Sequence, residues 1–270
     1  MKPALLLPLA SILASSPAFA EDDTAELQRK LDRSIAYEAV ENISNAFGNW
    51  IDDHQWPLMS ALFARDGWRQ KYLVGFYESP EHILTAETLQ APPSPGPRRA
   101  IRIHLRMQPV IDVNEDATHA YLRTRLLHFT ANWDRAGEVK NGMYPNDAAV
   151  LEKGVWKLSV VGIDEPYFVS AGWANGWARV PPYDNSRRTT TPQGMRSLAE
   201  RYPPDVPLSA MPVRQGAFTI GPEFVHFPEV KPMWFHYPNP VSGRLPENYC
   251  PDLRTCEPGV QRPAQRGTHE

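Results

Sequence analysis

Apolar residues near the start of the chain recur every three or four positions, which is the spacing of one helical face. This rhythm predicts a long helix over residues Thr24–Trp50. The same spacing predicts a shorter helix over Gln55–Ala64. A Ser-Pro-Glu run at residues 79–81 predicts the start of a third helix, because proline is favoured in the first helical turn. Between the second and third helices, Gly67–Tyr77 has the pattern of a short strand followed by a turn.

The rhythm changes to alternation further along the chain, which is typical of half-buried strands. Two long runs, Ala100–Val113 and Thr118–Asn132, flank a hairpin turn. Two more, Lys140–Leu151 and Val155–Tyr167, flank a turn at residues 152–154. Long strands joined by tight turns predict a curved antiparallel sheet. Because the helices come first and the strands follow, we expect an α+β fold with the helices packed on one face of the sheet.

The first twenty residues have the pattern of an export signal rather than of a folded element. Lys2 is followed by a leucine-rich apolar run, and a small-residue A-x-A site ends at Ala20. The run is too short to span a bilayer, which needs about 20 apolar residues. We therefore expect cleavage after Ala20 and a secreted or periplasmic protein. A retained N-terminal anchor is the alternative.

The last hundred residues, 171–270, form a third region of different composition. They hold 16 of the 28 prolines together with many aromatic residues. We expect extended chain wrapped over residues 21–170, with one helix within 187–202 and disorder beyond Cys256. In an oxidising compartment the two cysteines, Cys250 and Cys256, predict a local disulfide, with free thiols as the alternative.

Composition and charge exclude several classes of function. The chain has 270 residues and a net charge of −3, from 28 Lys and Arg against 31 Asp and Glu. This balance argues against a basic nucleic-acid-binding protein, and we expect no membrane span. The eight histidines and two cysteines lack close ligand spacing, so we expect no dedicated metal site and no cofactor.

Three stretches together resemble the SnoaL-like branch of the NTF2-like superfamily. The first is DDHQWPLMSALFARDG at residues 52–67. The second is HLRMQPVIDV at residues 104–113 with Asp-Ala at 116–117, where Gln108 replaces the usual asparagine of the family. The third is GMY at 142–144, ending in GVWKL at 154–158. The order and spacing of these motifs carry the resemblance, which covers roughly residues 27–170.

The resemblance implies a cone-shaped fold in which a curved antiparallel sheet and N-terminal helices enclose one apolar pocket. Members include ketosteroid isomerase, scytalone dehydratase and polyketide cyclases, most of which use neither metal nor redox cofactor. Other members are not catalytic, so the fold alone does not settle the function. Members often dimerise through the sheet face, which implies a homodimer. The core without the export signal, together with the tail around residues 235–244, also resembles bacterial diarylpropane deformylases, which release formaldehyde from lignin-derived aromatic diols.

The resemblance and the strand alternation together select the candidate catalytic residues. The family places its motif histidine in the pocket, which points to His104 and, on the same side of an alternating strand, Gln108. Asp52 matches a family position at the pocket mouth. A histidine has the ordinary pKa for proton transfer near neutral pH, and an aspartate beside it would fix its tautomer. The alternatives are a structural or solvent-facing histidine and a helix-capping aspartate.

Further candidates come from neighbouring strands. Tyr121, Arg123 and Arg125 share one face of the next strand, where arginine would stabilise an oxyanion and the others would bind substrate. Tyr144 of the third motif would donate a hydrogen bond to a substrate oxygen, and Trp56 would offer an aromatic surface. Ordinary roles are an exposed strand face for the arginines and core packing for the aromatic residues.

These observations favour a cofactor-independent lyase or isomerase acting on a hydrophobic, oxygenated aromatic small molecule. A base would remove a proton, and water, formaldehyde or a shifted double bond would result. The alternatives are a periplasmic protein that binds aromatic compounds in the same pocket without turnover, and an interaction module.

Overall fold

The computed structural model describes residues 19–71, 74–92, 100–132, 135–162, 171–172, 193–207, 238–247 and 249. Three expectations concern residues that lie mostly outside these ranges: the export signal, the C-terminal extension and the two cysteines. The export, wrapping and disulfide expectations therefore stay predictions.

Four helices are described, and each lies where the sequence predicts one. Helix α1 runs from Phe19 to Asp52 and is longer at both ends than its periodic pattern predicts. Helix α3 (Ser79–Gln90) has proline in its first turn, as predicted. Helix α4 (Gln193–Arg201) lies within the predicted 187–202. None of the described helices is both long enough and apolar enough to cross a membrane.

Helix α2 (Trp56–Ser60) is much shorter than predicted. The Trp56, Met59 and Phe63 positions fit a helical period, but Phe63 already begins a strand and pairs with Leu158. Short apolar runs are ambiguous between helix and strand, and here the neighbouring strand decides the outcome.

The strands form one mixed sheet. Their order is β3-β4-β5-β6-β1-β2-β8, and β7 pairs with β5 off this path. All described pairings are antiparallel except that of β1 with β6, which is parallel. The bounds are β1 Phe63–Lys71, β2 Gly75–Glu78, β3 Ala100–Val113, β4 His119–Asn132, β5 Arg135–Glu152, β6 Val155–Val161, β7 Ala171–Gly172 and β8 Val206–Pro207.

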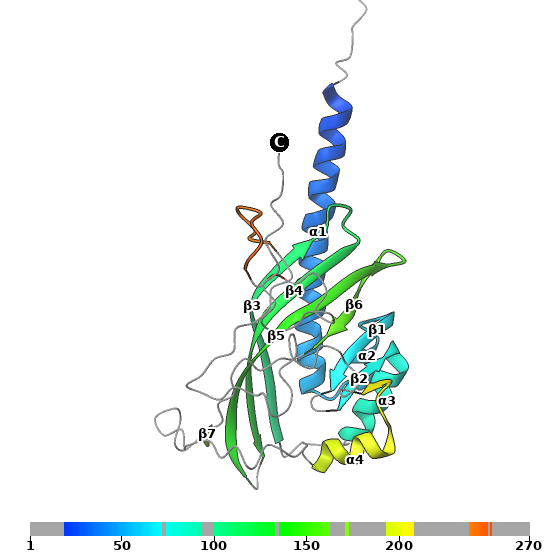
Figure 1. The fold of residues 1–270 in the computed structure, drawn as a ribbon, viewed down its shortest axis with the longest axis vertical. Coiled ribbons are helices and arrows are strands. Elements are labelled where there is room, and N and C mark those ends of the chain that lie inside the picture. The colour runs from blue at the N-terminus through cyan, green and yellow to red at the C-terminus, as the bar shows by residue number, and fades with distance from the viewer. Residues whose placement is uncertain are drawn as a thin grey trace, which may run out of the picture.

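Strand β3 is an edge strand, and α1 packs along it (Figure 1). The N-terminal part of α1 continues beyond the end of the sheet (Figure 1). Leu27, Leu31 and Ile35 of this helix are exposed. We call the face of β3 and β4 that α1 covers the inner face. On the opposite, outer face, Ile103 and Leu105 of β3 are exposed, which confirms the alternation expected of this strand.

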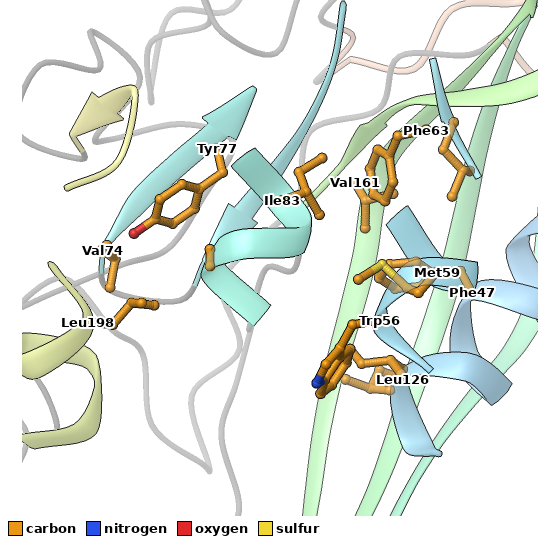
Figure 2. Packing of buried hydrophobic residues seen from close by; sticks show 13 residues of the cluster. Phe47, Trp56, Met59, Phe63, Val74, Tyr77, Ile83, Leu126, Val161 and Leu198 are labelled. Carbon is orange, nitrogen blue, oxygen red and sulfur yellow. The ribbon is translucent and has the colours of Figure 1, made fainter. Parts of the chain in front are cut away.

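The buried core has two parts, both anchored on α1. The larger part joins Phe47 of α1 to Trp56 and Met59 of α2, and extends to Tyr77 and to Leu198 of α4 (Figure 2). The smaller part packs Ala36 and Val40 of α1 against the sheet, and its partners there are Val113, Ala117, Ala120, Leu122, Ala149 and Trp156. Helix α1 therefore contributes side chains to both core clusters.

Truncation of Leu122 tests this anchoring. Leu122 is 1% exposed in the smaller core, whereas Leu27 of α1 is 65% exposed. We expect Leu122→Ala to lower the free energy of unfolding by about 2–5 kcal/mol through lost burial and a residual cavity. Leu27→Ala, the matched control, changes it by about 0.5 kcal/mol or less. Urea unfolding measures both, and equal effects would contradict this description of the core.

Candidate active site

The end of α1 and the middle of β3 meet at a pair formed by Asp52 and His104. The ring Nδ1 of His104 lies 2.5 Å from Oδ1 of Asp52. The backbone N–H of His104 donates to the second oxygen, Oδ2, at 2.8 Å. One carboxylate therefore fixes both the main chain and the ring of one residue. Asp52 is not a cap for α2, because Gln55 occupies the N-cap position and no side-chain capping bond is present.

The edge position of β3 explains why the backbone N–H of His104 is available to donate to Asp52. His104 is paired in register with His128 of β4, yet its N–H points to Asp52. Residues that face each other without exchanging backbone hydrogen bonds bring their side chains closest together in an antiparallel pair. The rings of His104 and His128 are accordingly stacked, with centroids 3.9 Å apart and planes 17° apart.

Burial sets the protonation state of His104. Its side chain is 11% exposed and that of Asp52 is 17% exposed. Burial lowers the pKa of His104 from its ordinary value of 6.5, and the nearby charges of Arg102 and Arg69 act in the same direction. The hydrogen bond and negative charge of Asp52 oppose this shift without cancelling it. His104 is therefore a neutral imidazole near neutral pH.

Three more charged side chains are buried close to this pair. Glu87 of α3 binds Arg69 through one oxygen and Lys71 through the other, the latter at 2.7 Å. Burial lowers the pKa of Lys71 well below its ordinary value of 10.5, and the charges of Arg69 and Arg102 lower it further. Because the charge of Arg69 reaches His104, this cluster and the Asp52–His104 pair belong to one electrostatic site.

A second buried ion pair flanks the site along β3. Arg106 donates to Asp147 of β5, which also accepts the backbone N–H of Gly162 at 3.0 Å. Burial raises the pKa of Asp147 against the opposing effect of Arg106. The guanidinium carbons of Arg69 and Arg106 lie 5.1 and 5.4 Å from the ring centre of Phe47. Such cation–π contacts hold both arginines against α1.

Among the selected residues whose side chains the structure describes, it brings together His104 and Asp52. Gln108 does not continue the alternation: it has a positive φ of 52°, lies where the β3–β4 register shifts, and is exposed. Trp56 is 1% exposed in the core, and its indole N–H donates to the carbonyl of Ala91. It therefore has the packing role that was the alternative for it.

The β4 candidates are on the opposite face of the sheet from His104. Tyr121, Arg123 and Arg125 alternate with Leu122 and Leu126, whose side chains are in the core. Tyr121 and Arg125 are exposed, while Arg123 is buried. The backbone of Tyr144 pairs with Thr124 in the β4–β5 register, and its side chain lies outside what the structure describes.

Sequence reasoning missed His128 and the cluster of Arg69, Lys71 and Glu87. The signal for His128 was available, because both strand bounds and the hairpin turn place it opposite His104. The cluster had a weaker signal, since its members lie on separate elements, with Arg69 and Lys71 on β1 and Glu87 on α3. Within the described ranges, no group of three or more His, Cys, Asp or Glu side chains is arranged to hold a metal ion.

Residues 32–161 match the family model of the SnoaL-like domain. No curated protein matches the chain. Similar solved structures include the hexachlorocyclohexane dehydrochlorinase LinA-type3 from Novosphingobium barchaimii, with 20% identity, a TM-score of 0.45, and coverage of 57% of this chain and 99% of that one.

A second similar structure is ActVI-ORFA from Streptomyces coelicolor. It is 16% identical, with a TM-score of 0.40 and coverage of 47% of this chain and 94% of that one. At these identities and scores, the solved structures say nothing about the chemistry of this chain.

Replacement of Asp52 tests the electrostatics of the pair. Asp52→Asn removes the negative charge that raises the pKa of His104, so we expect that pKa to fall further below 6.5. Asp53→Asn changes the adjacent, exposed carboxylate and is the matched control. NMR titration of labelled histidines measures both variants. A larger shift in Asp53→Asn than in Asp52→Asn would contradict the pairing.

Proposed function

We propose that this chain, whose residues 32–161 match the family model of the SnoaL-like domain, is a cofactor-independent lyase or isomerase that works by acid–base catalysis. The observation that carries the proposal is the double contact of Asp52 with the ring and the backbone of His104. A buried imidazole held in one orientation by a carboxylate is the arrangement that general-base catalysis requires.

His104 is the proton-transferring group in this proposal. The Asp52 carboxylate accepts a hydrogen bond, so the proton of the neutral ring is on Nδ1 and the lone pair is on Nε2. Nε2 is the atom that takes the substrate proton. Asp52 then stabilises the imidazolium that forms.

Arg69 is our candidate for stabilising negative charge on the substrate. Its charge reaches His104, and Glu87 and the Phe47 ring hold its guanidinium in place. A cation fixed before the reaction stabilises an oxyanion without reorganising during the reaction. Arg102 lies two residues before His104 on the inner face, and its positive charge also lowers the pKa of His104. The proposed substrate is therefore an oxygenated molecule that develops oxyanion character.

The finer proposal is the removal of formaldehyde from a diarylpropane-1,3-diol. Nε2 of His104 takes the proton of the primary hydroxyl, and the bond between that carbon and its neighbour breaks to release formaldehyde. The electron pair forms a carbon–carbon double bond and expels the second hydroxyl, which leaves as water with the proton from His104. The products are a stilbene, formaldehyde and water. The resemblance of residues 235–244 to diarylpropane deformylases supports this choice.

Product analysis by mass spectrometry tests the proposal. The chelator-treated protein is incubated with a racemic diarylpropane diol that carries a free phenol. We expect formaldehyde and a stilbene, with the rate reduced about 100-fold or more in His104→Gln and Asp52→Asn, and near the wild-type rate in Asp53→Asn. Equal rates in all four proteins would overturn the role of the pair. Binding of the diol without turnover would replace the enzyme by a binding protein.

The pH profile gives a second, independent prediction. Because the base must be neutral, kcat/KM rises with pH through the pKa of His104 in the free enzyme. Burial lowers that pKa, so the midpoint lies below 6.5 and the profile is flat between there and neutrality. Steady-state kinetics between pH 4.5 and 8 measure the midpoint. A midpoint above 6.5 would contradict a neutral, buried His104 as the base.

A further inference from the structure

Gly48 occupies the point of closest approach between α1 and β3. It is buried in the helix, and a Cβ atom added to it would lie 3.3 Å from the backbone carbonyl oxygen of His104. The side-chain carbons of Arg106 would be next, at 3.5 and 3.8 Å. The arginine carbons belong to a flexible side chain, but the carbonyl is part of the strand. A side chain at position 48 would therefore make a close contact with the backbone carbonyl oxygen of His104.

Asp52 follows Gly48 by four residues, which is about one helical turn, so both face the same strand residue. Gly48 meets the carbonyl of His104, while Asp52 accepts the N–H of the same residue. Both backbone polar groups of one edge-strand residue, His104, thus face consecutive turns of α1. The distance of the helix from the strand at position 48 sets the reach of the carboxylate at position 52.

We propose that Gly48 is a positioning residue, whose missing side chain lets α1 approach β3 closely enough for Asp52 to hold both the backbone and the ring of His104. The inference deepens the proposed function and rests on it for its effect on catalysis. Glycine is otherwise a poor choice inside a long helix, since only proline is less favourable there. Close approach to the strand is a physical reason for its presence.

The test is the titration of His104 by NMR in Gly48→Ala, Asp52→Asn and the double variant. Asp52 raises the pKa of His104, so a helix pushed away from the strand weakens that effect and lowers the pKa. We expect Gly48→Ala to shift the pKa downward, part of the way to its value in Asp52→Asn. In the Asp52→Asn background the alanine adds no shift, because the contact through which it acts is gone.

Asn45→Ala is the matched control on the same helix. Asn45 is exposed, and its change to alanine also raises helix propensity, so both single variants share that effect. We expect the control to leave the titration of His104 unchanged. In the deformylation assay Gly48→Ala lowers kcat/KM roughly threefold to fivefold, as a displacement of a few tenths of an ångström would.

The titration separates this inference from the proposed function, because it needs no substrate. A wild-type protein without turnover would remove the function and leave the titration result standing. A Gly48→Ala variant that titrates like the wild type overturns the inference. So does an equal shift with and without Asp52, or unfolding of both Gly48 variants, since Gly48 would then serve the fold rather than the pair.

Discussion

The bond between the Asp52 carboxylate and the backbone N–H of His104 is the constraint on which the rest of the site depends. An edge strand presents peptide groups that no neighbouring strand satisfies, and proteins cover such edges with helices or side chains. Here the last turn of α1 does so with a carboxylate. The same carboxylate has a second oxygen free for the ring, so closing the sheet edge also orients the imidazole.

Several buried charged side chains lie close to the Asp52–His104 pair. Buried ion pairs seldom improve on apolar packing, because desolvation offsets much of their attraction. Two such groups nevertheless flank the site, Arg106 with Asp147, and Glu87 with Arg69 and Lys71. The two apolar core clusters that pack against α1 supply the folding stability that offsets the cost of burying these charges. A contribution to folding stability therefore does not explain why these charged side chains surround a histidine.

Periodicity predicted the elements that are long and regular, and failed where single residues break the repeat. The alternation of β3 put His104 on the opposite side from Ile103 and Leu105, whereas the family resemblance, rather than periodicity, selected His104 and Asp52 as candidates. One residue with a positive φ, Gln108, shifts the register and ends the alternation that had grouped it with His104. The pairing of β3 with β4 decides which face Tyr121, Arg123 and Arg125 occupy, and alternation within one strand does not contain that information.

The lowered pKa of His104 supports the proposed role of this site in proton transfer. A ligand-binding histidine gains most from being charged or from donating through both nitrogens, and burial beside two arginines opposes both. A base gains from the opposite state: a neutral ring, one nitrogen held by an acceptor, and a partner ready to stabilise the charge that arrives. Asp52 supplies the holding contact and the compensating charge at once, because it bonds to the ring from a helix whose position the strand backbone fixes.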